Sequence, residues 1–405
     1  MPETTNSSVQ SHSPAPVLRI LGIRGVPAAH GGFETFAENL SLYLVARGWR
    51  VLVYCQEEGG GPITTDSWRG VDRVRVPVRG HGAASTVLFD WICTRHAARH
   101  SDLCLTLGYN TAAFSALLKA RGVPSLINMD GIEWRRSKWS LPARWWFRVN
   151  DWLGCWLADQ LIADNPGIAD LLARRTARER IEMIPYGAPQ LVDVPPEPLR
   201  AFGLEPECYF TVIARPEPEN AILEIVAAFS RRPRGCRLVV VGDYDPRVSY
   251  HARVMRAAGP EVVFLGAQYD RALLDALRYH CLGYLHGHQV GGTNPSLVEA
   301  MGAGNAVIAH DNSYNRWVAG EGALYFRSPD EADWAITRLI AYPGLRRQLA
   351  QINRSRAAET FSWERVLQAY RSLLIRHLPR SAVARPQGAA GTLDESLHAD
   401  SAGGV

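Results

Sequence analysis

The sequence predicts an α/β protein built from two Rossmann-like, doubly wound domains that face a cleft. Its 405 residues, 47 % hydrophobic and 21 % charged, favour two globular domains over one. Apolar, β-branched runs alternate with amphipathic stretches, which is typical of parallel sheets covered by helices on both faces. The alternation stops once, in a proline-rich segment at 185–198, and then begins again. We interpret that segment as a linker between the domains.

The first half of the chain provides one complete doubly wound domain, which we place at 17–187. The apolar residues at 33–46 recur at helical spacing, and helices are expected between most of the strands. Strands are predicted at 17–23, 50–55, 71–76, 103–107, 125–129, 160–163 and 181–184.

The second half repeats the strand and helix alternation without repeating the sequence, and we place this domain at 198–355. Strands are predicted at 209–214, 237–241, 262–265, 281–285 and 306–309, and helices at 221–229, from 247 and at 270–279. The pattern is helical throughout 331–378. Its last part, 362–375, is amphipathic enough to pack against a surface other than its own sheet. The ends, 1–16 and 379–405, have the composition of disordered segments.

Composition excludes several classes of function. A net charge of +4 is too small to indicate a nucleic-acid partner. Seven cysteines without a Cys-x-x-Cys pair argue against a zinc site or a disulfide framework and favour a reducing compartment. No apolar run approaches the ~18 residues of a membrane span, and the N-terminus lacks the apolar core of a signal peptide. We therefore expect a cytoplasmic protein.

We expect neither a metal ion nor another cofactor. Asp243 and Asp245 form an acid-x-acid pair like those of some metal-dependent sugar transferases. Pro246 follows them, so we favour the alternative that the pair caps a helix starting near Arg247.

The loop at 286–301 has the features of a phosphate-binding site. It follows a predicted strand, contains His286 and His288, and passes through glycines into a helix whose N-cap is Asn294. A helix start presents unpaired amides and the positive end of the helix dipole, which suit a diphosphate. Glu299, about one turn further, suits the hydroxyls of a ribose. The alternative is a plain glycine-rich turn before a packing helix.

A second glycine-rich loop, at 22–34, ends the first strand. Gly31 and Gly32 allow a charged ligand to approach the backbone closely. Glu34 lies in the first turn of the next helix, where it complements the dipole or binds a hydroxyl. The alternative is a tight turn with a capping carboxylate.

Charged residues follow two other predicted strands. Arg215 follows 209–214 directly and is suited to neutralising the charge of a leaving diphosphate, unless Glu217 or Glu219 pairs with it. Asp130 and Glu133 follow 125–129, where an acid facing the cleft accepts a proton or binds a sugar hydroxyl. The alternative for Asp130 is to cap the following turn.

The segment 134–156 interleaves six tryptophans with arginines, among them Arg144 and Arg148. Tryptophan and arginine together suit the interface of an anionic membrane. The alternative is a helix that packs its aromatic residues inside while its arginines extend outward.

Taken together, these motifs resemble the retaining glycosyltransferases of family 4, which have the GT-B fold, and among them the rhamnosyltransferases of bacterial cell-surface polysaccharide synthesis. The resemblance covers 18–378. It rests on the glycine-rich loop from Gly22, Asp-Gly-Ile-Glu-Trp from Asp130, Ala-Arg-Pro-Glu-Pro-Glu-Asn from Ala214, the loop from His286, and Phe-Ser-Trp-Glu from Phe361.

The resemblance implies a nucleotide-diphosphate sugar bound mainly by the second domain, an acceptor bound mainly by the first, and a final helix, 356–378, that returns to the first. Asp130 and Arg215 are the implied catalytic residues, with Glu299 on the ribose. The implied donor-binding residues are Gly31, Gly32, Glu34, Arg215, Asn220, His286, His288, Gly291, Gly292, Thr293, Asn294 and Glu299.

Two positions depart from the wider family. Gly291 stands where the first of a pair of glutamates is expected, and Asn220 stands where a lysine is common. The subgroup shares both changes, so we interpret them as an altered donor site.

The function this predicts is metal-independent, retaining transfer of a sugar, with dTDP-rhamnose as the best donor candidate. The acceptor is a saccharide or a polyprenyl-diphosphate-linked oligosaccharide at the inner face of the membrane. The alternatives are a nucleotide-sugar epimerase of the same fold, which needs no acceptor, and a non-catalytic nucleotide-sugar-binding protein.

Overall fold

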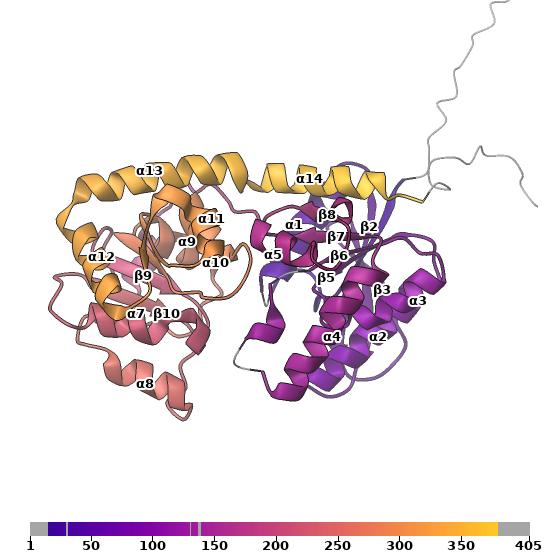
Figure 1. Ribbon diagram of the computed structural model, residues 1–405, viewed down its shortest axis with the longest axis horizontal. Helices are drawn as coiled ribbons and strands as arrows, with labels where there is room; N and C mark the ends of the chain where they lie inside the picture. The colour runs from indigo at the N-terminus through magenta and orange to yellow at the C-terminus, as the bar shows by residue number, and fades with distance from the viewer. Residues whose placement is uncertain (1–14, 30, 130, 137–138, 380–405) are drawn as a thin grey trace, which may run out of the picture.

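Eight strands of the N-terminal half form one sheet in the order β3-β4-β2-β1-β5-β6-β7-β8 (Figure 1). The structure is a computed structural model that describes residues 15–29, 31–129, 131–136 and 139–379. The strands are β1 (Val17–Leu21), β2 (Arg50–Glu58), β3 (Thr64–Trp68), β4 (Val71–Val78), β5 (Leu103–Leu107), β6 (Ser125–Asn128), β7 (Gln160–Ala163) and β8 (Ile181–Met183). The helices of this half are α1 (Gly32–Val45), α2 (Ala83–Ala97), α3 (Ser115–Ala120), α4 (Leu141–Leu157) and α5 (Pro166–Leu172).

Six strands of the C-terminal half form a second sheet in the order β11-β10-β9-β12-β13-β14. They are β9 (Tyr209–Ile213), β10 (Arg237–Val241), β11 (Val262–Phe264), β12 (Gly283–His286), β13 (Val307–His310) and β14 (Ala323–Phe326). The helices of this half are α6 (Glu197–Arg200), α7 (Ile222–Phe229), α8 (Ser249–Ala257), α9 (Arg271–Tyr279), α10 (Pro295–Gly302), α11 (Ser313–Ala319) and α12 (Pro329–Ala341). Two Rossmann-like domains are therefore present, as predicted.

Both sheets have a switch point in their strand order, and the predicted site residues follow those strands. β1 lies between β2 and β5, and β9 lies between β10 and β12. In open parallel sheets, ligands bind beyond the carboxyl ends of the strands at such a point. β1 leads into the first glycine-rich loop, β9 leads to Arg215, and β12 ends at His286.

Two long C-terminal helices connect the domains. α13 (Pro343–Thr360) lies along the second domain and α14 (Trp363–Arg376) along the first (Figure 1). The buried residues of α14 recur at helical spacing and pack on α1, with the rings of Phe36 and Tyr370 4.5 Å apart. At the crossing, the Ala188 amide donates to the Phe361 carbonyl at 2.7 Å. The prediction that the last helix packs away from its own sheet is confirmed.

Two strands were not predicted. β3 pairs antiparallel with β4 at the edge of the sheet, and its sequence is largely polar and exposed. Asp66 in β3 binds Arg73 and Arg75 of β4, so ion pairs replace the apolar pattern of a strand. β14 is four residues long, and its two middle residues are only partly buried, so its apolar signal is weaker than that of the predicted short strands.

Two further expectations concern the ends of the chain and a membrane-spanning helix. The ends predicted to be disordered, 1–16 and 379–405, lie outside the described residues except for 15, 16 and 379. None of the described helices combines the length and the hydrophobicity that crossing a bilayer requires.

We predict that Tyr370→Phe destabilises the protein by about 1–3 kcal/mol. The buried amide of Asn128 donates to the Tyr370 hydroxyl at 2.7 Å, and the variant removes that acceptor. Denaturant unfolding measures the loss. Tyr43→Phe is the control, because the Tyr43 hydroxyl is exposed and 3.5 Å from Glu364. An equal effect of both substitutions would contradict this role of the Asn128 contact.

Candidate functional site

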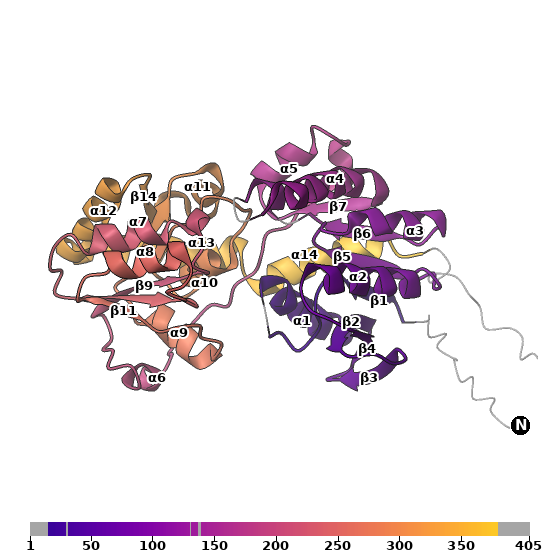
Figure 2. The same ribbon diagram turned by 90° about the horizontal axis from the view of Figure 1, so that it is seen from below.

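The two domains meet at positions where glycine leaves room for the opposite backbone. A Cβ added at Gly32 would lie 2.9 Å from Cγ of Pro295, the first residue of α10. A Cβ at Gly131 would lie 3.2 Å from the Gly291 Cα. The two predicted glycine-rich loops, together with the segment after β6, therefore lie where the two domains meet, as the ribbon view from below shows (Figure 2).

The start of α10 has the predicted cap. The Asn294 side chain accepts a hydrogen bond from the Ser296 amide at 3.0 Å, and Pro295 is the first helical residue. The structure differs from the expectation of free amides next to this cap. Asp164, directly after β7 in the other domain, accepts the Thr293 amide at 2.7 Å, and its carbonyl accepts the Thr293 hydroxyl. A carboxylate of the first domain therefore occupies an amide that we expected to be open to a diphosphate.

Gly292 leaves room for the same contact. A Cβ added to it would overlap the Asp164 carboxylate, so a larger residue would displace that carboxylate from its place beside the Thr293 amide. Asp164 is not among the site residues predicted from the sequence. The signal was present, because Asp164 follows a predicted strand directly, as Asp130 and Arg215 do.

His286 and His288 form a stacked pair at the carboxyl end of β12, with ring centroids 4.4 Å apart. His286 is 1 % exposed, and neither of its ring nitrogens has a hydrogen-bond partner in the described structure. Asn312 and Asn315, which begin α11, both donate to the His288 carbonyl and hold the loop in place.

Burial and neighbouring positive charge keep both histidines neutral. Burial lowers the pKa of His286 well below its usual value. Burial, with the charges of Arg136 and Arg215, lowers the pKa of His288 to about 3. An anion bound among these groups would reverse the electrostatic part of that effect.

Arg215 is exposed, and its guanidinium makes no ion pair within the described residues. The alternative pairing with Glu217 or Glu219 is therefore wrong. Glu219 is buried and lies 4.0 Å from Arg136 of the other domain. The Asn220 side chain donates to the Arg215 carbonyl at 2.8 Å, so its amide holds this loop.

Glu299 has a partner that sequence reasoning missed. Arg278, on α9 and 6 % exposed, binds its carboxylate at 2.5 Å. The pair fixes the direction of Glu299, while the carboxylate remains partly exposed at 24 %. Contact between Glu299 and a ribose remains a prediction.

The acids of α1 bind the first glycine-rich loop. Glu34 accepts the Arg24 amide at 3.4 Å, and Glu38 accepts the Ala28 amide at 2.7 Å. A Cβ at Gly31 would lie 3.1 Å from the Glu34 carboxylate. For Glu34 the capping alternative therefore has direct support in the structure.

The described acids Glu133 and Asp245, after β6 and β10, each bind an arginine. Asp130 lies outside the described residues, so its predicted catalytic role remains a prediction. Glu133 binds Arg136 at 2.8 Å. Asp245 binds the amide and guanidinium of Arg247. It stabilises the turn before α8, which starts at Ser249, so our interpretation of it as a helix cap is wrong. Among the described residues, no group of three or more acids, histidines or cysteines is arranged to hold a metal ion.

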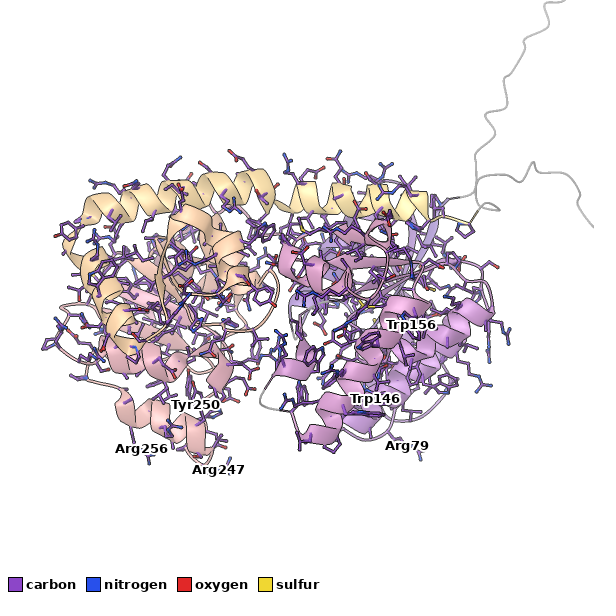
Figure 3. The ribbon with its side chains drawn as sticks, in the orientation of Figure 1. Arg79, Trp146, Trp156, Arg247, Tyr250 and Arg256 are labelled. Carbon is purple, nitrogen blue, oxygen red and sulfur yellow. The ribbon has the colours of Figure 1, made fainter. Side chains whose placement is uncertain are left out.

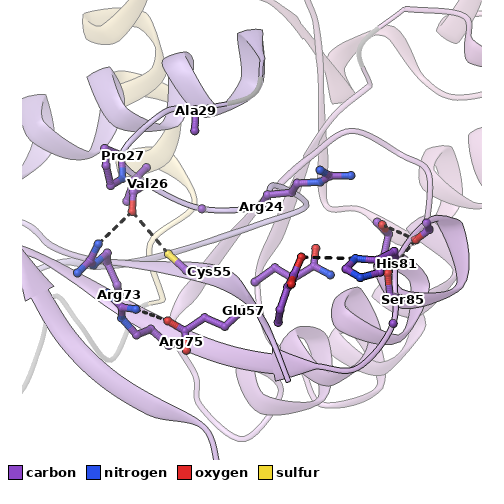
Figure 4. A pocket seen from close by; sticks show the side chains of 16 residues that line it. Arg24, Val26, Pro27, Ala29, Cys55, Glu57, Arg73, Arg75, His81 and Ser85 are labelled. Atoms are coloured by element: carbon purple, nitrogen blue, oxygen red, sulfur yellow. Dashed lines mark hydrogen bonds and ion pairs between the residues drawn. The ribbon is translucent and has the colours of Figure 1, made fainter. Parts of the chain in front are cut away.

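A cavity of about 390 Å³ opens beside the first glycine-rich loop, at the carboxyl ends of β1, β2 and β4 (Figure 4). Arg24, Glu57, Arg75, His81 and the start of α2 line it. Its charges are largely compensated from within, because Arg75 binds Glu57, and His81 lies 3.4 Å from Glu58. These side chains were not predicted as a site, because they are far apart in sequence and become neighbours only when the strands pair.

We predict that Gly292→Ala loosens the contact between the domains, because its added methyl group displaces the Asp164 carboxylate from the Thr293 amide. The lost charge-assisted hydrogen bond is worth about 1.5–3 kcal/mol. Small-angle scattering should show a larger radius of gyration, and Asp164→Ala in the same chain should restore it. Gly344→Ala is the control, because its added Cβ meets nothing within 4 Å. An unchanged scattering curve would contradict the prediction.

We predict that stability falls as pH drops from 6.5 towards 3. The pKa of His286 is lowered in the folded state, so below 6.5 the unfolded state binds a proton that the folded state does not. This costs up to about 1.4 kcal/mol per pH unit for one buried histidine. His286→Phe should flatten the curve of unfolding free energy against pH, whereas His81→Phe, at an exposed position, should not. Parallel curves for His286→Phe and the parent protein would refute this.

Comparison with known proteins agrees with this architecture. Residues 16–189 match the family model described as "Domain of unknown function (DUF1972)", which is less than half of the chain. No curated protein matches the sequence.

Solved structures with low sequence identity match nearly the whole chain. Sucrose-phosphate synthase from Thermosynechococcus elongatus has a TM-score of 0.74 and 20 % identity, covering 89 % of this chain and 100 % of that one. HepE of Anabaena, in complex with UDP and glucose, has a TM-score of 0.68 and 16 % identity, covering 89 % and 99 %. The UDP-forming α,α-trehalose-phosphate synthase from Burkholderia vietnamiensis has a TM-score of 0.67 and 13 % identity, covering 89 % and 97 %. The chain therefore has the GT-B fold, two Rossmann-like domains with a C-terminal helix packed back on the first.

Proposed function

We propose that the protein is a retaining glycosyltransferase that moves a sugar from a nucleotide diphosphate to a hydroxyl acceptor. The observation that supports it most is the exposed guanidinium of Arg215, which makes no ion pair among the described residues and lies beside neutral His288 at the carboxyl end of the second sheet. An exposed arginine there is suited to phosphate oxygens. The likeness to HepE, crystallised with UDP and glucose, points to the same class of donor.

In this proposal the donor diphosphate replaces the Asp164 carboxylate at the Thr293 amide. The carboxylate and a phosphate offer the same negatively charged oxygens to that amide. Donor binding then requires the domains to separate and close again around the diphosphate. Gly291, Gly292 and Asn294 contribute backbone at this point, with Gly31 and Gly32 facing them from the first domain.

The chemistry follows from charge. As the bond between the sugar and the diphosphate lengthens, negative charge grows on the leaving oxygens. Arg215 and the backbone amides stabilise that charge in a closed cleft from which water is excluded. Arg136 adds positive charge on the opposite side of the cleft. Asp130 is proposed to act at the reacting sugar, and Glu299, oriented by Arg278, to bind the ribose.

The cavity beside the first glycine-rich loop is our candidate for the acceptor. Because its acids and bases largely neutralise each other, it suits a hydroxyl-rich saccharide better than a strongly charged ligand. Arg24 lines it without an ion pair of its own among the described residues, so it remains able to contact an anionic group such as a linked diphosphate. The finer proposal is rhamnose transfer from dTDP-rhamnose to a saccharide or a polyprenyl-diphosphate-linked oligosaccharide.

The direct test is the melting temperature in the presence of UDP-, dTDP- and GDP-sugars. A ligand that binds only the folded state raises both the free energy of unfolding and the melting temperature. At a ligand concentration of 100 Kd, the free energy of unfolding rises by about 2.7 kcal/mol. The best stabiliser is then incubated with saccharide acceptors, and release of the nucleoside diphosphate is measured. Donor turnover that needs no acceptor would indicate the epimerase instead. Absence of any stabilisation would contradict the proposal.

We predict that Arg215→Ala lowers turnover at least about tenfold with a smaller effect on donor affinity, because it acts on charge that develops in the transition state. Glu299→Gln should mainly weaken donor binding, by about 1 kcal/mol, while keeping a side chain for Arg278. Steady-state kinetics and calorimetry separate the two effects. Arg253→Ala on exposed α8 is the control. Equal, small changes in all three variants would rule out these roles.

A further inference from the structure

One face of α4 exposes large apolar side chains to solvent. Leu141 is 77 % exposed, Trp145 68 %, Trp152 41 % and Trp156 57 %. Their spacing of four, seven and four residues places them in one stripe along the helix. The opposite side of the helix is buried, through Asn150, Asp151, Gly154 and Cys155. The stripe is therefore a second, outward-facing apolar surface on a helix that is already packed.

The charges on this exposed face are all positive. Arg148 lies in the stripe itself, three residues after Trp145, and is exposed. The one acid of α4, Asp151, points inward, where it accepts the Trp134 indole N–H at 2.8 Å and binds Arg175. Arg175 also lies over the Trp152 ring, 5.2 Å from its centroid. A partner of α4 therefore meets indole rings and guanidinium groups without a nearby free carboxylate on the helix.

Basic residues of both domains extend to the same side as α4. In Figure 3, Arg79 and Trp146 of the first domain and Arg247 and Arg256 of the second lie along the edge opposite α13 and α14, whereas Trp156, at the other end of α4, lies away from that edge. Arg247 is bound by Asp245. A flat, anionic partner at this edge would contact α4 and basic residues of both domains.

From the stripe, its charge and its position, we propose that α4 docks the protein on a bilayer containing anionic lipid. Trp145, Trp152 and Trp156 would lie at the level of the headgroups, where an indole ring suits both apolar and polar surroundings. Arg148 would bind lipid phosphates, and the arginines of α8 would contact the same surface. This inference does not rest on the proposed transfer activity. If both hold, the docked protein would receive a lipid-linked acceptor beside its cleft.

The test uses the full chain and vesicles of phosphatidylcholine, with or without an equal part of phosphatidylglycerol. The parent protein should sediment with the anionic vesicles, and less so as salt is added. Trp145→Ser combined with Trp156→Ser should lower the partition coefficient at least about tenfold. Arg148→Glu should weaken binding to the anionic vesicles about fivefold, with little change on neutral ones.

A matched control is available on α12, where exposed Trp334 has Arg338 5.0 Å from its ring centroid. Trp334→Ser with Arg338→Glu removes the same chemistry from another surface and should leave vesicle binding unchanged. Thermal melts verify that each variant is folded. If the Trp145 and Trp156 variant is not folded, Trp152→Ser takes its place.

Three outcomes would overturn the proposal. The parent protein fails to bind anionic vesicles, or the Trp145 and Trp156 variant binds as well as the parent. The third is a parent protein that is dimeric without lipid and becomes monomeric in that variant, which would make the stripe an interface between two copies of the chain.

Discussion

The cleft of this protein is formed where glycines of one domain let the other domain approach closely. Gly131 lies against Gly291, and Gly32 against Pro295, so the two sheets present their strand ends at contact distance. Only at such positions can the amides of one domain reach a group held by the other. The contact between the Thr293 amide and Asp164 is the direct result, and it sets how near the remaining site residues come to each other.

The electrostatics of the cleft follow from that approach. Arg136 and Arg215 come from different domains, and both act on the His288 ring, which burial already keeps neutral. Three acids of this region are engaged: Glu219 lies near Arg136, Arg278 binds Glu299, and an amide binds Asp164. The cleft thus combines cations and amides with acids that are already bound, an environment in which a doubly negative ligand gains more than a neutral one.

The sequence was a good guide to the fold because parallel, buried strands have a strong apolar signal, and most core strands lie where they were predicted. Strands held by ion pairs, such as β3, carry no such signal. Within the site, the Asn294 cap was predictable because capping is a local interaction. Asp164, Arg278 and the cavity residues were not predictable from the sequence, because each of them interacts with a partner that is far away in sequence. The free amides expected before α10 are partly occupied for the same reason.

The two chain crossings between the domains lie side by side. The segment after β8 and the start of α14 are joined through Ala188, whose amide donates to Phe361 and which forms a bridge with Ser362. Both crossings therefore act as one pivot rather than as two separate tethers. An opening motion about that axis would move the far rim of the cleft most and the residues near Tyr186 and Trp363 least, whose rings lie 5.0 Å apart beside the crossings. In the proposed transfer reaction, the far rim would therefore be the route for substrate and product.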